Sequence, residues 1–173
     1  MVTIREKKYE DCAECERVYT LTWQQTYRGI IPDDFLDRMS IVEDERTKNK
    51  QAMFHNDPYK KFVLVDDDKI VGVTSFGKSR KEEYPDCGEL QTLYILEEYK
   101  GKGYGKQLFL KAVEVLSEMG YKDMIVGCFK GNPTCNFYKK MGGEYVKSVM
   151  LTLGKYELED DLYIFRNIES LLK

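Results

Sequence analysis

Lysines and glycines alternate through a short segment that joins a predicted strand to a predicted helix. Residues 100–106 read KGKGYGK. Glycine lacks a Cβ atom, so the oxygen atoms of a ligand can approach its backbone closely. The first backbone N–H groups of a helix are unpaired and carry the positive end of its dipole, and the lysines add charge. The segment therefore predicts a binding site for a phosphorylated ligand.

Two common phosphate-binding motifs do not fit this segment. A Walker P-loop requires Ser or Thr after its Gly-Lys pair, but Gln107 follows Lys106 here. A dinucleotide-binding motif requires a third glycine at the position of Lys106. The pattern Q/R-x-x-G-x-G/A does fit at Gly103 and Gly105, with Lys100 in place of Gln or Arg. This spacing counts against a nucleotide phosphotransferase.

A tyrosine in a short predicted helix is the second residue with usable chemistry. Asn132 is a good N-cap and Pro133 a good first helical residue, so Tyr138 lies nearly two turns into the helix. A phenol with a pKa near ~10 can donate a proton to a thiolate of comparable basicity. The alternative is a tyrosine that only packs against a sheet with its hydroxyl at the surface. The residues alone leave both interpretations open.

The elements that must position these residues follow from hydrophobic periodicity and turn signals. The pattern predicts one α/β (α+β) domain over residues 1–173, with helices early and a mixed, mostly antiparallel central sheet flanked by helices. The strand after the 103–119 helix completes one parallel βαβ unit. Helices are predicted at residues 10–27, from residue 32, at 41–54, 103–119 and from 132, and strands at 2–5 (an edge strand), 61–65, 70–76, 89–96, 123–129, 144–153 and 156–165.

Taken together, these motifs resemble the GNAT superfamily of acyl-CoA N-acyltransferases over nearly the whole chain. The resemblance is carried by Leu93-Tyr94-Ile95, by Lys100, Gly101, Lys102, Gly103, Tyr104, Gly105 and Lys106, and by Asn132-Pro133, Phe137-Tyr138 and Gly142. It implies a GNAT-like fold and an N-acetyltransferase that moves an acetyl group from acetyl-CoA to a primary amine by direct attack in a ternary complex. A non-catalytic acyl-CoA-binding or sensor protein is the alternative from another class.

The resemblance also assigns roles to individual residues. In the family, the strand matching residues 93–95 carries a bulge and diverges from the strand matching 123–129, which admits the pantetheine arm. The Ile95 N–H would polarise the thioester carbonyl, and Tyr138 would protonate the leaving thiolate. The expected coenzyme A contacts are Leu93, Tyr94, Ile95, Lys100, Gly101, Lys102, Gly103, Tyr104, Gly105, Lys106, Asn132, Asn136 and Tyr138, with Asn132 also readable as a cap alone.

An attacking amine must lose a proton, and Glu89 is the first candidate for the general base, ahead of Glu83 and Glu82. Residues 23–32 resemble a W-x-x-x-Y-x-G-I-x-P segment of family members, so Trp23, Tyr27 and Phe35 are expected to line the acceptor pocket. Core packing is the alternative for these aromatics. Acidic residues at 33–37 and 82–89 favour a cationic acceptor, such as a polyamine, an aminoglycoside or a lysine-bearing peptide, unless they are only a solvated face.

Composition and charge indicate which partners and which cellular location to expect. The net charge is -3 and the pI about 5.4, which counts against nucleic acid as a partner. No signal peptide and no membrane span are recognisable. Five scattered cysteines indicate reduced thiols in the cytoplasm. A homodimer stays possible.

The cysteines do not point to a further reactive site. The Cys12–Cys15 pair reads as one helix face rather than half of a zinc or redox site, because no second pair follows and His55 is the only histidine. We therefore expect no metal. Cys135 lacks a base for nucleophilic work, so an acyl-cysteine route is disfavoured.

Overall fold

The computed structural model describes residues 1–39 and 44–173, in which seven strands form one sheet in the order β1-β2-β3-β4-β5-β7-β6. Neighbouring strands are antiparallel except β4 and β5, which are parallel. This arrangement confirms the predicted mixed sheet, with β1 at one edge. The strands are β1 (Val2–Glu6), β2 (Lys60–Asp66), β3 (Lys69–Lys78), β4 (Gly88–Ile95), β5 (Met124–Phe129), β6 (Glu144–Leu153) and β7 (Tyr156–Phe165).

The predicted helices also form, and the ends that lie within the described residues are shifted by one or two residues. The helix predicted from residue 10 begins two residues later, after a 3-10 turn, and the first residues of the helix predicted at 41–54 lie outside the described residues. Within the described ranges, no helix combines the length and apolar character needed to cross a bilayer. The helices are α1 (Cys12–Thr26), α2 (Asp33–Asp37), α3 (Asp44–Met53), α4 (Tyr104–Glu118) and α5 (Thr134–Lys140), with 3-10 turns η1 (Tyr9–Asp11), η2 (Phe54–Asn56), η3 (Glu97–Tyr99) and η4 (Ile168–Leu172).

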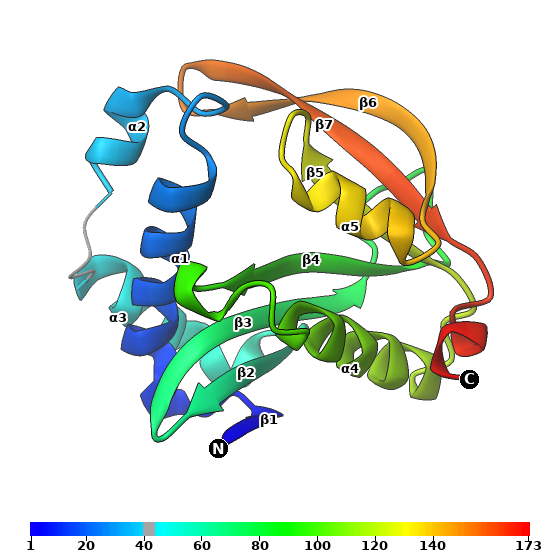
Figure 1. Cartoon of the computed structure of the whole chain (residues 1–173), viewed down its shortest axis with the longest axis horizontal. Coiled ribbons are helices and arrows are strands. Elements are labelled where there is room, and N and C mark those ends of the chain that lie inside the picture. The colour runs from blue at the N-terminus through cyan, green and yellow to red at the C-terminus, as the bar shows by residue number, and fades with distance from the viewer. Residues whose placement is uncertain (40–43) are drawn as a thin grey trace.

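Helices cover both faces of the sheet (Figure 1). On one face, α1 packs on β3 and β4 and also contacts α3. On the other face, α4 and α5 share one core with the sheet, and Phe109 of α4 lies at its centre. The Phe109 ring centroid is 5.8 Å from Phe137, 6.4 Å from Tyr138 and 5.2 Å from Phe165. This core fixes α5, and with it Tyr138, relative to the sheet.

The sheet divides between β4 and β5. These strands pair only where Gly88–Leu90 faces Met124–Val126. Beyond that point β4 stays with β3, and β5 stays with β7. The register of β3 and β4 shifts so that Gln91 is an extra residue on β4, a β-bulge that bends the strand. Figure 1 shows the two halves of the sheet separating after the paired segment.

Truncation of a side chain in the core that α4 and α5 share with the sheet tests how much this core stabilises the fold. Phe109 is fully buried, so Phe109→Ala should lower the free energy of unfolding by about 3–5 kcal/mol. Gln107→Ala, at an exposed position of the same helix, should change it by less than about 0.5 kcal/mol. Urea unfolding followed by circular dichroism measures both; a similar loss in the two variants would contradict this role for Phe109.

Candidate active site

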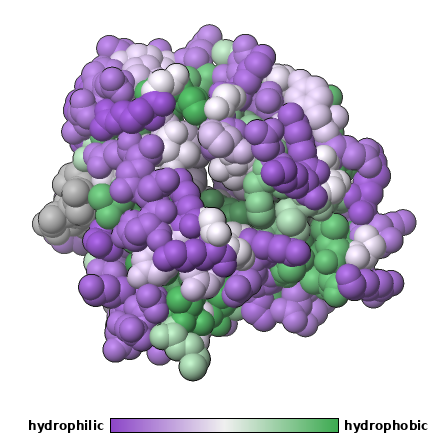
Figure 2. Space-filling model, in the orientation of Figure 1, coloured by the Kyte–Doolittle hydropathy of each residue, from purple (hydrophilic) through white to green (hydrophobic). Residues whose placement is uncertain are grey.

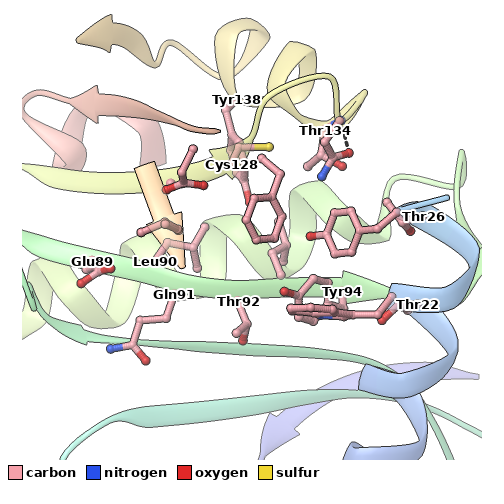
Figure 3. A pocket seen from close by; sticks show the side chains of 18 of the residues that line it. Thr22, Thr26, Glu89, Leu90, Gln91, Thr92, Tyr94, Cys128, Thr134 and Tyr138 are labelled. Atoms are coloured by element: carbon pink, nitrogen blue, oxygen red, sulfur yellow. Dashed lines mark hydrogen bonds between the residues drawn. The ribbon is translucent and has the colours of Figure 1, made fainter. Parts of the chain in front are cut away.

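The division of the sheet creates a cleft of about 500 Å³ between β4 and β5. Its walls come from α1, β4, β5, α5 and β7. Figure 2 shows the molecule hollowed near the middle of this view, with hydrophilic side chains on one side of the opening and hydrophobic ones on its lower right side. Figure 3 shows the lining residues, with Glu89 to Tyr94 along β4 and Tyr138 reaching toward β4 from the opposite side.

The backbone of β4 offers unpaired groups to this cleft. The Leu96 N–H donates to the Val71 carbonyl at 2.9 Å, on the β3 side of the strand. Because backbone groups alternate along a strand, the N–H and C=O groups of Leu93 and Ile95 point the other way, toward the cleft. A ligand with amide groups could therefore lie along β4 as an additional strand would.

Tyr94 lies between these two residues and is arranged differently. Its backbone groups point to β3, and its ring packs edge-on against Tyr19 of α1 at 5.4 Å. Burial raises the pKa of the Tyr94 phenol above its ordinary value. Tyr94 is thus held on the α1 side.

The Lys-Gly segment lies at the end of this cleft, between η3 and α4. Gly101 and Gly103 have φ values of +74° and +83°, a conformation that favours glycine at both positions. The first α4 bond links the Gln107 N–H to the Gly103 carbonyl at 3.2 Å. The N–H groups of Tyr104, Gly105 and Lys106 therefore precede the helical ladder and stay open to a ligand.

The three lysines of this segment have different surroundings. Lys100 lines the cleft, and its Nζ lies 2.6 Å from a Glu97 carboxylate oxygen. The Lys102 ammonium lies 5.2 Å from the centre of the Tyr99 ring. Lys102 and Lys106 are both exposed, so they present their charges to solvent beside the helix terminus.

Tyr138 is 5% exposed and lines the cleft. Burial raises the pKa of its phenol well above the ordinary value. The hydroxyl therefore keeps its proton over the working range of pH, and it can donate that proton to a stronger base.

The turn before α5 fixes the start of this helix. Asn132 is buried at the cleft, and its Oδ1 accepts a hydrogen bond from the Thr134 N–H at 3.0 Å, the dashed line of Figure 3. The Asn132 side chain thus caps the turn before α5. Asn136, expected at the cofactor, is exposed and is not among the residues that line the cleft.

Of the three glutamates considered as bases, Glu89 alone lines the cleft. It is 3% exposed and ion-paired: the Arg80 guanidinium lies 2.8 Å from Oε1, and the Arg80 backbone N–H lies 2.8 Å from Oε2. Glu82 and Glu83 are exposed, and Glu83 pairs with Lys147. The structure does not bring those two to the site.

Asp160 of β7 is a cleft residue that the sequence analysis missed. It is 6% exposed, and a Cβ placed on Gly127 would lie only 2.3 Å from its Oδ2, so the glycine makes room for the carboxylate. Burial raises the pKa of Asp160 to about 6. Asp160 lies two residues from both Leu158 and Leu162, so the period of two in a strand places all three on the inward face. This signal was available in the sequence.

A second cavity of about 590 Å³, here called the chamber, lies between α1, α3 and strands β2 to β4. Trp23 and Phe35, two of the aromatics expected at an acceptor pocket, both line this cavity. Tyr27 instead lines the cleft, packed edge-on against Trp23 at 5.2 Å and Phe129 at 5.3 Å. The two cavities adjoin along β4, because both are lined by Trp23, Arg80, Gln91, Thr92 and Tyr94.

The acidic runs seen in the sequence do not line either cavity, apart from Glu89. Asp33 and Asp37 pair with Arg28, and Asp34 pairs with Arg38. These carboxylates therefore form paired surface clusters and give no support for a cationic acceptor.

The chain belongs to the acetyltransferase (GNAT) family, whose family model matches residues 10–143. Members transfer an acyl group from acetyl-CoA, so the chain is an acyltransferase of the N-acetyltransferase type. It is 34% identical over 148 residues to the uncharacterized N-acetyltransferase YuaI of Bacillus subtilis (strain 168), which covers 84% of this chain and 82% of that protein.

Solved structures share the fold at lower identity. The PaiA N-acetyltransferase from Thermoplasma acidophilum, in complex with coenzyme A, has a TM-score of 0.74 at 21% identity, over 96% of this chain and 99% of that chain. The putative acetyltransferase YncA from Salmonella typhimurium, with its cofactor acetyl-CoA, has a TM-score of 0.72 at 19% identity, over 96% of this chain and 94% of that chain.

The buried carboxyl predicts a characteristic pH dependence of stability. Asp160 binds its proton more tightly in the folded protein, where its pKa is raised from 3.8 to about 6. The free energy of unfolding should therefore fall as pH rises through this window, by about 3 kcal/mol, and Asp160→Asn should remove the fall. Urea unfolding of both proteins at pH 4 and pH 7 measures the difference between them; parallel profiles would contradict the raised pKa.

Proposed function

We propose that the cleft binds acetyl-CoA and the chamber binds a primary amine, which attacks the thioester directly in a ternary complex. The observation that carries this proposal is the end of β4–β5 pairing after Leu90, which leaves the backbone groups of Leu93 and Ile95 open. The pantetheine arm contains amide groups, so it can replace the missing strand in hydrogen bonding. The Asn132 amide nitrogen provides a further donor.

The phosphate groups of coenzyme A fit the segment before α4. Three open N–H groups, the helix dipole and the exposed lysines meet there, and positive-φ glycines bring the backbone close. Lys100, at the family's Gln or Arg position, keeps the positive charge at the mouth of the cleft.

Bound acetyl-CoA supplies an activated thioester carbonyl, and the residues of this chain polarise it and move protons. The Ile95 N–H donates a hydrogen bond to the carbonyl oxygen. The amine nitrogen forms the new C–N bond as the C–S bond breaks. Tyr138 donates its proton to the leaving sulfur and becomes a phenolate. The proton lost by the amine passes to a carboxylate, and a proton then returns through water to the phenolate, which restores the phenol.

Two carboxylates compete for the amine proton. Glu89, the first expectation, is held by Arg80 on both oxygens. Asp160 has no hydrogen-bonded side chain among the residues that the structure describes, and its raised pKa makes its carboxylate the stronger base. We therefore assign the proton to Asp160, directly or through a water molecule, with Glu89 holding Arg80 at the junction of the two cavities.

Calorimetric titration with acetyl-CoA, with ATP and NAD as controls, tests the binding part of the proposal. Thiol release from acetyl-CoA with a panel of amines tests the reaction. We expect acetyl-CoA alone to bind and at least one amine to release thiol. If acetyl-CoA binds but none of the amines releases thiol, the protein is better described as an acyl-CoA sensor. If the folded protein does not bind acetyl-CoA, the assignment of the cleft is overturned.

Replacement of the proposed acid should separate catalysis from binding. Tyr138→Phe should lower kcat by about 10²- to 10⁴-fold, because the sulfur loses its proton donor, while the Kd for acetyl-CoA stays unchanged. Tyr121→Phe, outside the cleft, is the matched control. Steady-state kinetics and calorimetry measure the two effects. An unchanged kcat in Tyr138→Phe would contradict the role of Tyr138 as the proton donor.

The two carboxylates can be distinguished by their effect on the pH–rate profile. The rate should fall below about pH 6 as Asp160 takes up its proton. Asp160→Asn should lower kcat by about 10²-fold or more and abolish this acidic limb, whereas Glu89→Gln should keep the limb. If Glu89→Gln loses the limb and Asp160→Asn retains it, the base is Glu89.

A further inference from the structure

The chamber is lined by more basic than acidic side chains. Among the residues that the structure describes, the basic ones are Lys7, Arg46, Lys50, Lys61 and Arg80, and the acidic ones are Glu16 and Asp57. Three of the basic groups have carboxylate partners. Arg46 lies 3.5 Å from Glu16, Lys61 pairs with Asp57, and Arg80 pairs with Glu89.

Lys7 and Lys50 are the lysines without such a partner in the described part of the chain. Lys7 is only 9% exposed and lines the chamber. No carboxylate of residues 1–39 and 44–173 lies within ion-pair distance of Lys7, so its charge is not neutralised at the chamber wall, and an anion that enters the chamber would be stabilised there. Lys50 contributes from the opposite wall, because it lies on α3, which contacts α1 beside the sheet (Figure 1).

The register of the sheet shows how far the lysines of the chamber lie from β4, where the two cavities adjoin. Lys61 lies opposite Ser75 on β3, and Ser75 lies opposite Thr92 on β4. The Ser75 and Thr92 hydroxyls are hydrogen-bonded at 2.7 Å, so these side chains share one face of the sheet. The Lys7 N–H donates to the Lys61 carbonyl at 2.9 Å, which adds Lys7 to the same row. Since neighbouring strands are about 4.8 Å apart, Lys61 lies about 10 Å from β4 across the sheet.

From this arrangement we propose that the acceptor is an amine that also carries an anionic group, a carboxylate or a phosphate, at the far end of a short chain. The amine lies at Thr92 and Gln91, where the chamber meets the cleft, and the anion lies among Lys7, Lys50 and Lys61. This inference depends on the proposed function, because it names the substrate class of the same site. A polyamine would bring a second positive charge to the basic end.

Three amines of the same chain length test the proposal. Nα-acetyl-lysine carries a carboxylate, N-acetylcadaverine is the same molecule without it, and 5-aminopentyl phosphate carries a phosphate. We expect kcat/KM for at least one anionic amine to exceed that for N-acetylcadaverine by about tenfold or more. The two anionic arms identify which group the lysines accept.

Matched variants locate the effect. Lys50→Met and Lys7→Met should each lower kcat/KM about tenfold for the preferred anionic amine and leave the value for N-acetylcadaverine unchanged. Lys48→Met, on the same helix but outside the lining of the chamber, should change neither. Lys50 and Lys48 are both exposed, so these two variants should fold even where Lys7→Met does not.

The outcomes separate this inference from the proposed function. Equal rates for all three amines, or a preference for N-acetylcadaverine, would overturn the anionic acceptor while the acetyltransferase assignment stands. Equal effects of Lys50→Met on amines with and without the anionic group would also overturn it. Failure of every amine to release thiol, with or without the anionic group, would instead count against the proposed function.

Discussion

The absence of β4–β5 pairing beyond Leu90 and Val126 is the constraint on which the rest of the site depends. Backbone groups left open in a protein interior are costly unless a partner satisfies them, and here the opening leaves those of Leu93 and Ile95 for a ligand. The bulge at Gln91 bends β4 as the strands separate, and the core around Phe109 holds α5 against the far side. One interruption of the sheet thus creates the cleft and positions Tyr138 in it.

Gln91 also connects the two cavities. It lines both, and its Nε2 is buried without a hydrogen-bond partner among the described residues. A buried amide donor that is left unpaired marks a place where a ligand atom or a water molecule completes the bonding. The Arg80–Glu89 pair lies at the same junction. In the proposed function the reacting groups therefore meet where β4 loses its pairing with β5 and keeps its pairing with β3, and the bulge lies at that point.

Local chemistry made much of this architecture predictable from the sequence. The glycines around Lys102, the Asn132 cap and the periodic apolar face of α4 are short-range signals, and each leads to the element found. Their meeting at one cleft came from the family resemblance, because no local signal shows where β4 leaves β5. The fit of Asp160 over Gly127 and the capture of Glu89 by Arg80 are long-range contacts, and only the folded chain displays them.

The chamber shows why total charge is a poor guide to the acceptor. The chain has a net charge of -3, and its acidic runs suggested a cationic substrate. Four of those carboxylates pair with Arg28, Arg38 or Lys147 on the surface, so their field is screened by solvent and by their partners. Lys7 and Lys61 come from sequence positions far apart, and adjacent strands bring them to one cavity wall. Charges inside a cavity of low dielectric act more strongly on a ligand than a larger number outside it, so the acceptor class that we propose follows from the lining of the chamber and not from the net charge.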